Sequence, residues 1–450
     1  MKLFRLGLFS ACAALAFPSI AQAQNLLQLY DMARNYDASY QSAKSLYNAS
    51  VSKADQGQAQ LLPTVNLGLT TTRAQLDYRP DTPSSSDIAY KRWYLTNSAT
   101  VTAVQPLYRP ANMALYLQSS KVLGQAVAQL VTAEQDLMVR VSQAYFDVLA
   151  SQDSLEFVKA QKVAVAEQLA SAKRNFEVGT ATITDTREAQ ARFDLVVAQE
   201  IGAENDLRVK RLTIDNLVGI KNAAPRPLVK SAVLKPALPD DPETWVKESS
   251  INHPGILNAR LALDIARLEI ERAKAGHKPT VDLQGSYGGT RNLGGTAASG
   301  FNSFNSHVVS PTLQVLVNVP LFAGFATENR YKETVSLEDK ARHDLEVAER
   351  TVSQATRTAY FGVVSGLGQV KALEAAESSS QVALDANKLG YSVGVRINID
   401  VLNSQSQLFQ TKRDLAKARY DVLVGSLKLR QASGLLKEDD LQGVNAMLER

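Results

Sequence analysis

The chain has little of what most catalytic and metal sites are built from. It contains one cysteine, four histidines and two tryptophans in 450 residues. The cysteine, Cys12, lies in residues 1–23, where basic Lys2 and Arg5, an apolar run and the triplet Ala21-Gln22-Ala23 predict a secretory signal peptide cut after Ala23. A lipoprotein cut before Cys12 would lose the apolar run almost at its start. The mature chain therefore has no thiol, which excludes disulfides and zinc–thiolate sites.

Further absences narrow the function. No stretch offers 18 consecutive apolar residues, so no transmembrane helix is predicted. The histidines show no metal-ligand spacing, and no nucleophile, base and orienting group stand out as a set. Neither a metal, a cofactor nor an enzyme active site is expected. The formal net charge is +4, and the roughly +2 left after leader removal is too small for a nucleic-acid-binding stripe.

What the sequence does contain is a duplication. Tyr391–Asn403 (YSVGVRINIDVLN) repeats Phe176–Glu188 (FEVGTATITDTRE), with an aromatic residue, a glycine and an aspartate at the same spacing. Further pairs match at offsets of 214 to 216: Leu62–Leu67 with Lys278–Leu283, Gln105–Tyr108 with Val319–Phe322, Ala144–Phe146 with Ala359–Phe361, and Gly219 with Gly434. Self-similarity of this kind predicts two structural repeats. We assign them to residues 24–220 and 242–434, joined by a linker at 221–241 and followed by a tail at 435–450.

Each repeat has the same predicted order of elements. A first helix runs from Leu26 to about Gln60, or from Pro242 to about Gly276. Two strands follow, because apolar residues alternate with polar ones, as in Leu313–Val319. The segments Tyr78–Trp93 and Gly288–Asn305 are predicted loops from their Pro, Gly, Ser and Asn content.

Long helices complete each repeat. Pro106 and Pro320 are predicted to close the strands and to open these helices, since proline fits a first helical turn. The helical patterns run to about Arg174 and Lys388, which corresponds to about 100 Å each. Their seven-residue spacing indicates coiled coils.

The duplicated motifs lie where one helical pattern stops and the next begins. Gly179 and Gly394 are predicted to form the turns, because glycine adopts positive φ without steric cost. Asp185 and Asp400 would then sit in the first turn of the following helix, where a carboxylate meets free N–H groups. A role as helix caps and a role facing a channel are compatible, and both remain open for these two residues.

Four amphipathic strands cannot close on themselves, and open sheet edges are not tolerated in lipid. Either the strands form a soluble sheet, or several exported chains pool their strands. Apolar-outward alternation together with secretion favours pooling.

Over essentially its whole mature length, the chain resembles the TolC family of outer-membrane channels. The resemblance is carried by both turn motifs and by Asn25–Tyr30, Gln105–Tyr108 and Ala418-Arg419-Tyr420. It implies an α+β membrane protein: a homotrimer in which each chain gives four strands to a twelve-stranded outer-membrane β-barrel, continued by a long α-helical coiled-coil tunnel in the periplasm. It also implies an exit duct for tripartite efflux pumps or type I secretion. The implied partners are a periplasmic adaptor, an inner-membrane pump of RND, MFS or ABC type, and outer-membrane lipid.

The resemblance also implies a gate at the periplasmic end. Tyr391 and Arg396 correspond to residues that tether the closed tip to Thr184 and Asp185 on the neighbouring coil, and Asp400 to a ring of carboxylates. The next ring position, acidic in the best-known member, is Asn403 here, so weaker cation binding at the entrance is expected. Two other readings remain: a periplasmic coiled-coil adaptor or scaffold without its own pore, and an exported enzyme, for which no catalytic set is found.

Overall fold

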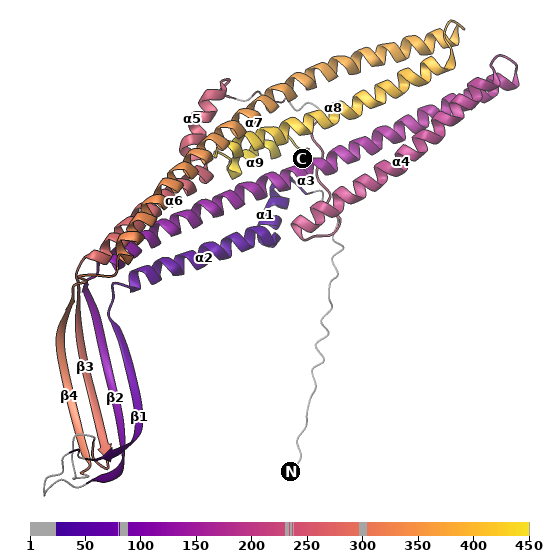
Figure 1. Cartoon of the computed structure of the whole chain (residues 1–450). Coiled ribbons are helices and arrows are strands. Elements are labelled where there is room, and N and C mark those ends of the chain that lie inside the picture. The colour runs from indigo at the N-terminus through magenta and orange to yellow at the C-terminus, as the bar shows by residue number, and fades with distance from the viewer. Residues whose placement is uncertain are drawn as a thin grey trace, which may run out of the picture. The chain divides into compact units, whose positions relative to one another are not determined.

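The computed structural model describes residues 24–449 except 80, 82–88, 230–233, 235, 237 and 297–303, so the predicted signal peptide lies outside the described residues. The elements are α1 (Leu26–Tyr36), α2 (Ala38–Ala59), β1 (Thr64–Tyr78), β2 (Tyr90–Tyr108), α3 (Pro110–Glu177), α4 (Ile183–Val218), α5 (Pro242–Asn252), α6 (Pro254–Lys274), the 3-10 turn η1 (Ala275–His277), β3 (Thr280–Leu293), β4 (Ser306–Asn318), α7 (Ala326–Ser392), α8 (Asn398–Ala432) and α9 (Glu438–Asn445). Two helices, two strands, a very long helix and a return helix occur in this order twice, in agreement with the predicted repeat (Figure 1).

Contacts divide the chain into two compact units. The unit called here the tip unit comprises the described residues within Met1–Gln41, Glu134–Pro242 and Arg357–Arg450, and the sheet unit comprises those within Ser42–Ala133 and Glu243–Thr356. The helices α3 and α7, of 68 and 67 residues, contribute to both units. In the tip unit, α3 and α4 run side by side as one hairpin, and α7 and α8 form a second (Figure 1).

Among the described residues, no helix is both long enough and apolar enough to cross a membrane.

The four strands of the sheet unit form one antiparallel sheet in the order β1-β2-β3-β4. Its register aligns Val65 with Ala103, Gly285 and Leu313, one on each strand. Because side chains alternate between faces, one face gathers exposed apolar residues from both edge strands. These are Val65, Leu67 and Leu69 on β1, with Leu313, Val315 and Val317 on β4. The four predicted strands and their alternation are confirmed, and β1 and β4 are the sheet edges within the chain.

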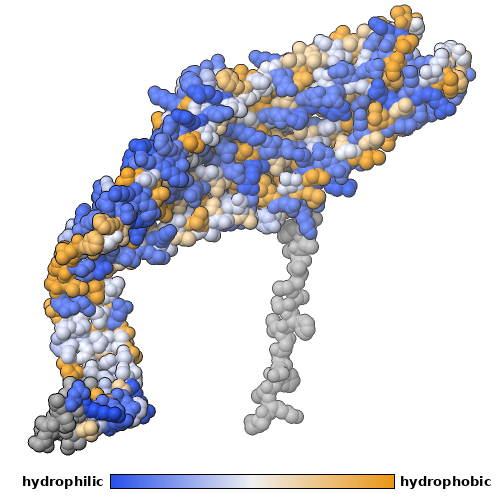
Figure 2. Space-filling view, in the orientation of Figure 1, coloured by the Kyte–Doolittle hydropathy of each residue, from blue (hydrophilic) through white to orange (hydrophobic). Residues whose placement is uncertain are grey.

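The opposite face of the sheet is polar. Gln314 Nε2 donates to Gln284 Oε1 across β3 and β4 at 3.0 Å, and Thr96 Oγ1 donates to Asn292 Oδ1 at 2.9 Å. The sheet therefore presents one face suited to lipid and one suited to water. Along the strands, Figure 2 shows hydrophobic colour at the end of the sheet that joins the helices and hydrophilic colour near the opposite end.

The predicted loops between paired strands are too long. The strand β3 continues through Gly288 to Leu293, and β2 begins at Tyr90, whose ring packs 5.3 Å from that of Tyr78. Gly288 allows a close approach, because a Cβ there would lie 2.6 Å from Oγ1 of Thr100 on β2. Composition predicted a loop because it does not show this packing requirement.

The prediction that Pro106 and Pro320 open the long helices is wrong. Pro106 lies inside β2, at a register shift between Pro106 and Tyr108, where the strand tolerates a residue without an N–H group. The helix opens at Pro110 instead, and Pro320 lies in the segment between β4 and Ala326, where α7 begins.

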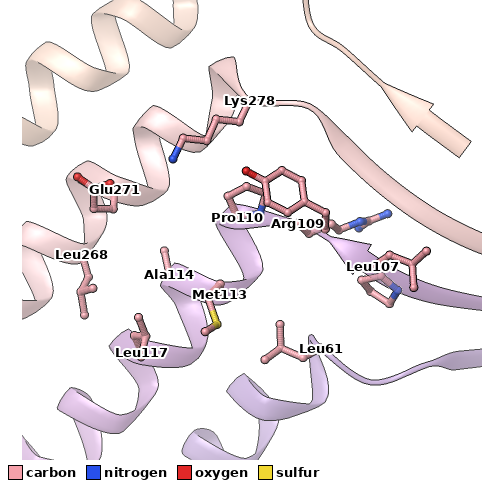
Figure 3. Close-up of a pocket in the computed structure, with 12 residues that line it drawn as sticks. Leu61, Leu107, Arg109, Pro110, Met113, Ala114, Leu117, Leu268, Glu271 and Lys278 are labelled. Carbon is pink, nitrogen blue, oxygen red and sulfur yellow. The ribbon is translucent and has the colours of Figure 1, made fainter.

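The segment between β2 and α3 is fixed by an ion pair and lies beside an apolar cavity. Arg109 donates from Nε and Nη2 to both carboxylate oxygens of Asp282 on β3, at 2.7 and 2.6 Å. This bidentate contact raises the pKa of Arg109. A cavity of about 590 Å³ beside Pro106 is lined by Leu107, Met113 and Leu268 among others, with Lys278 also on its wall (Figure 3).

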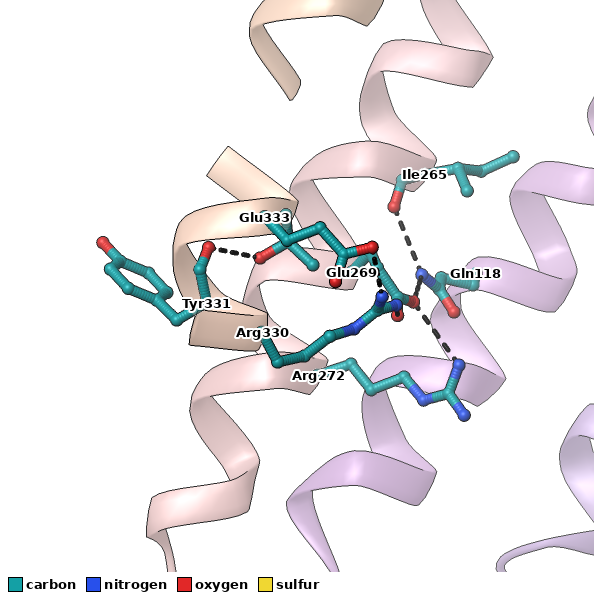
Figure 4. Close-up of polar contacts among 8 residues, drawn as sticks. Gln118, Ile265, Glu269, Arg272, Arg330, Tyr331 and Glu333 are labelled. Atoms are coloured by element: carbon teal, nitrogen blue, oxygen red, sulfur yellow. Dashed lines mark hydrogen bonds and ion pairs between the residues drawn. The ribbon is translucent and has the colours of Figure 1, made fainter. Parts of the chain in front are cut away.

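One carboxylate joins three helices of the sheet unit. Glu269 on α6 accepts from Gln118 Nε2 on α3 at 2.9 Å and from Arg330 Nη2 on α7 at 2.8 Å (Figure 4). Arg272 adds a longer ion pair of 3.4 Å. Burial by itself raises the pKa of Glu269, but the hydrogen bonds from Gln118 and Arg330 outweigh burial, so its pKa lies below the ordinary value.

Each predicted first helix is in fact two helices. Asp37 separates α1 from α2 and accepts from the backbone N of Tyr40 at 2.8 Å. In the second repeat, His253 accepts from the backbone N of Gly255, and Pro254 starts α6. The two breaks are 216 residues apart, so they follow the repeat. Both are set by local caps, which the helical pattern alone does not reveal.

Replacing Asp37 with Ala should destabilise the protein by about 1–3 kcal/mol, because it removes a helix cap and one of the two carboxylates that pair with Arg140. The Arg140 Nε would still donate to Asp136, at 2.7 Å. Arg140 donates from Nη1 and Nη2 to Asp37 at 2.9 and 3.0 Å, and these bonds lower the pKa of Asp37. The stabilisation is therefore complete above the ordinary pKa and is lost as the pH falls through the lowered one. Urea unfolding followed by circular dichroism at pH 7 and at pH 3 measures this, and Asp37→Asn should show a smaller loss at pH 7.

Candidate functional site

The two duplicated motifs form the turns of the two hairpins in the tip unit. Gly179 and Gly394 both have φ of +79°. The helix ends are closed alike: Thr180 N donates to Asn175 O and Val395 N donates to Gly390 O, each at 2.8 Å. This six-residue closure with a left-handed glycine is the Schellman arrangement, which explains why the motif needs glycine there.

The aspartates of the two motifs behave differently. Asp185 forms a capping box with Thr182: its carboxylate accepts from Thr182 N at 2.9 Å, and Thr182 Oγ1 accepts from Asp185 N at 3.2 Å. In the second hairpin the cap residue is Ile397, which offers no side-chain cap. Asp400 instead forms an ion pair of 3.7 Å with Arg396, one turn earlier. Asp185 is thus a cap, and Asp400 is available for another role.

The predicted tether residues have other partners within this chain. Asn175 Nδ2 on α3 donates to the Tyr391 hydroxyl at 3.3 Å, and Tyr391 packs against the cluster of Leu384, Val401 and Leu408. Arg396 is exposed, as is Thr184. Among the described residues, neither Tyr391 nor Arg396 forms a hydrogen bond or ion pair with Thr184 or Asp185. The tether to Thr184 and Asp185 therefore stays a prediction.

The α7–α8 hairpin is fastened to the α3–α4 hairpin through Asn398. This side chain is buried, accepts from Gln168 Nε2, and donates to the backbone oxygen of Asp185 at 3.4 Å. Nearby Leu402 enters the core formed by Val158, Val165, Leu169, Ala172, Ala189 and Val196 of α3 and α4. A few polar contacts and one apolar side chain thus join the hairpins near their turns.

Asn403 faces a cation. Arg192 Nη2 on α4 donates to Asn403 Oδ1 at 2.8 Å, and Asn403 is exposed. An amide oxygen here satisfies the guanidinium without adding negative charge. Where an acidic residue was expected, this chain thus has an uncharged amide that binds Arg192.

Further from the turns, the hairpins are linked by a buried polar contact. The Tyr420 hydroxyl on α8 donates to Asp153 Oδ2 on α3 at 2.7 Å, and Phe146 stacks on Tyr420 with ring centroids 5.6 Å apart. Burial raises the pKa of both Asp153 and Tyr420. Tyr145 and Phe146 are fully buried, so this aromatic pair serves packing.

Sequence reasoning missed Asn175, Gln168, Asn398 and Arg192. Two of them could have been found by aligning the repeats, because Asn398 corresponds to apolar Ile183 and Asn175 corresponds to Gly390. The absence of a side chain at Gly390 also has a use: a Cβ there would lie 2.7 Å from Cγ of Arg396. At these two positions, a difference in polarity between the copies coincides with a contact between the hairpins.

Known proteins resemble this chain in its repeated organisation and in its sequence. The family model described as outer membrane efflux protein matches residues 21–220 and 245–435, one match for each repeat. The outer membrane protein TolC of Vibrio cholerae is 32% identical, covering 99% of this chain and 98% of its own length. The alkaline protease secretion protein AprF of Pseudomonas aeruginosa is 29% identical, over 95% of this chain and 88% of its own length.

A solved structure supports the same fold. The outer membrane channel CmeC of Campylobacter jejuni superposes with a TM-score of 0.75 at 14% identity, covering 95% of this chain and 90% of that one. The resemblance, fold class, outer-membrane location and export role predicted from the sequence are thereby confirmed, and the family is one of transport channels, not of enzymes. The chain belongs to the outer membrane efflux protein family.

Proposed function

We propose that three copies of this chain form an exit duct that an adaptor and an inner-membrane pump open at the end formed by the two turns. The observation that carries this proposal is the four-stranded sheet, which has one apolar face, one polar face and two edge strands. Such a sheet is stable in lipid only when its edges pair with strands of other copies. Twelve strands from three copies would enclose a wide, water-lined pore.

The surface of the turns supports docking of an adaptor from the periplasm. Apolar side chains surround both glycines and are exposed: Val178, Val393, Val395 and Ile397, with Val395 79% exposed. Isolated apolar residues on a surface are ordinary, but a group at the tip of two adjacent turns suits a partner helix. An inner-membrane pump of RND, MFS or ABC type would then deliver the cargo. Relatives carry names of both protease secretion and efflux, so either cargo fits the family.

The proposed gate consists of residues from both copies of the turn motif. Tyr391 and Asn398 would hold the α7–α8 hairpin against the α3–α4 hairpin within a subunit, whereas Arg396 would reach Thr184 and Asp185 of a neighbouring copy. Asp400 and Asn403, one helical turn apart on α8, would line the narrowed opening. The exposure of Arg396, Thr184 and Asn403 in the single chain supports contacts beyond it.

Assembly is tested by a pair of neighbouring substitutions on β4. Leu313 lies on the apolar face and Gln314 on the polar face. An arginine facing lipid near mid-membrane costs about 2–4 kcal/mol, and three copies multiply that cost. Leu313→Arg should therefore strongly reduce the yield of membrane-inserted trimer, while Gln314→Arg should leave it near the parent level. Outer-membrane fractionation and native mass measurement in detergent give both yields.

Two results would contradict the proposal. One is a native mass of a single chain that still conducts ions in a bilayer. The other is an equal loss of inserted protein for both β4 variants, because then neither face of the sheet would be specific for lipid.

A further inference from the structure

Gln24, the first residue that the structure describes, is bound at two points by Ala224 of the segment between the repeats. Its backbone N donates to Ala224 O at 2.9 Å, and Arg226 N donates to Gln24 O at 3.1 Å, which forms a parallel bridge with Pro225. In addition, Ala224 N donates to the side-chain oxygen Oε1 of Gln24, at 2.9 Å. One residue thus holds both the backbone nitrogen and the amide oxygen of Gln24.

The side chain occupies the position that a preceding residue would take. In a parallel ladder that contains the two backbone bonds above, the N–H of Ala224 would bond to the carbonyl oxygen two residues before Gln24. Here the amide oxygen of Gln24 takes that bond. The side-chain oxygen and the backbone nitrogen of Gln24 therefore lie beside the same residue. The N–H of Ala224 has a hydrogen-bond acceptor that does not come from the predicted signal peptide.

From this placement we propose that Gln24 becomes the N-terminal residue and cyclises to pyroglutamate. The proposal rests on cleavage after Ala23, which the triplet Ala21-Gln22-Ala23 predicts, and it is independent of the proposed gate. The freed α-amine attacks Cδ of its own side chain. An N–Cδ bond forms, the Cδ–Nε2 bond breaks, and Nε2 leaves as ammonia with a proton from the amine. No oxidant or other co-reactant is required.

The surroundings favour this reaction and fit its product. An α-amine has a pKa of about 7.7–8.0, so an appreciable neutral fraction is present at neutral pH. The N–H of Ala224 on Oε1 stabilises the negative charge that develops on that oxygen during attack. The lactam keeps one N–H and one carbonyl oxygen, which match the two groups that Ala224 offers.

The product would seal the start of the mature chain. Tyr145, which is fully buried, donates from its hydroxyl to Arg226 O at 2.8 Å and to Gln24 O at 3.4 Å. A lactam removes the charge of the terminal ammonium beside this buried cluster and removes the free amine on which aminopeptidases act. The N-terminus would thus stay attached to the segment that joins the repeats.

The N-terminal peptide of the protein purified from outer membranes tests the proposal. We expect a peptide that begins at residue 24 and is about 17 Da lighter than its sequence requires, the mass of ammonia. Stepwise N-terminal sequencing should be blocked until the protein is treated with pyroglutamyl peptidase. A peptide with an unmodified Gln24, or a mature chain that begins at another residue, would overturn the proposal.

A rate comparison tests whether the fold assists. Protein that is purified rapidly at pH 5, where the α-amine is protonated and does not attack, is incubated at pH 8, and the unblocked fraction is followed by peptide mass. Ala224→Pro keeps the carbonyl but removes the N–H bound to Oε1, and should slow cyclisation about fivefold, as expected for loss of one hydrogen bond to the reacting group. Tyr145→Phe removes a hydroxyl from the same cluster and should cyclise at the parent rate. Equal rates for Ala224→Pro, the parent and the urea-unfolded chain would refute assistance by Ala224.

Discussion

Replacing Tyr391 with Phe and Arg396 with Ser should raise single-channel conductance severalfold while leaving the assembled protein intact. Tyr391→Phe removes the hydroxyl that accepts from Asn175 but keeps the ring in its apolar cluster. Arg396→Ser removes an exposed guanidinium from a position outside the apolar seam of α8. Contacts of these kinds contribute roughly 0.5–3 kcal/mol each, with the upper end for charged partners.

A sum of that size would allow the proposed gate to open. A few such contacts in each of three subunits would favour the closed state by an amount that an adaptor could offset through tighter binding to the open one. Planar-bilayer recordings of the reconstituted double variant measure the change. Arg187→Ser is the matched control, because Arg187 is an exposed arginine just after Asp185 in the first motif. Unchanged conductance of the double variant, at normal trimer yield, would show that other contacts close the tip.

A reversible lock tests the same contact in the opposite direction. The only cysteine is Cys12 in the predicted leader, so introduced cysteines meet no background thiol in the mature chain. Asn175 contacts the far end of the Tyr391 ring, so a direct disulfide between positions 175 and 391 would not span the gap. Asn175→Cys combined with Tyr391→Cys should instead hold the hairpins together when bridged by a bis-maleimide whose spacer contains a disulfide, and release them when that disulfide is reduced. Conductance should therefore rise on reduction in this variant and stay constant in each single variant.

The repeat made most of the fold predictable. Matching residues at offsets of 214 to 216 predict the strands, the long helices and both turns. Each of these is set by local requirements, such as alternation for β4 and positive φ for Gly179 and Gly394. The breaks at Asp37 and His253 were missed because a cap interrupts a helix without disturbing the apolar pattern around it. The end of strand β3 was missed because Gly288 allows close packing against Thr100 and does not mark a loop.

The tip was less predictable than the fold. The contacts of Tyr391 with Asn175 and of Asn398 with Gln168 join residues more than 200 positions apart, and no local rule pairs them. The motif gave the same expectation for Asp185 and Asp400, yet only the first hairpin has Thr182 to complete a capping box. The difference lies in the cap residue, Thr182 in one copy and Ile397 in the other. Comparing the copies residue by residue therefore carries more information than the shared motif.

Neutralising Asp400 should reduce the cation selectivity of the channel, most strongly at low salt. Its carboxylate is about one third exposed and forms an ion pair of 3.7 Å with Arg396. In a trimer, three such carboxylates would face a confined opening, where their attraction for cations exceeds that in bulk water. Salt screens the effect, because the Debye length falls from about 30 Å at 0.01 M to about 8 Å at 0.15 M. Reversal potentials of Asp400→Asn at both salt concentrations measure it, and no change at either would remove Asp400 from the lumen.

The effect of negative charge at the opening can also be tested by adding a carboxylate at position 403. A new carboxylate in Asn403→Asp would stand beside Arg192, which now donates to Asn403 Oδ1 at 2.8 Å. We therefore expect Asn403→Asp alone to change selectivity little, because the guanidinium neutralises the added charge at close range. Combined with Arg192→Gln, which leaves a neutral donor in place of the cation, the same substitution should raise cation selectivity clearly above the parent. Arg192→Gln alone, measured in parallel, separates the loss of a cation from the gain of an anion. A large effect of Asn403→Asp alone, or none in the double variant, would show that Arg192 does not control the charge at this position.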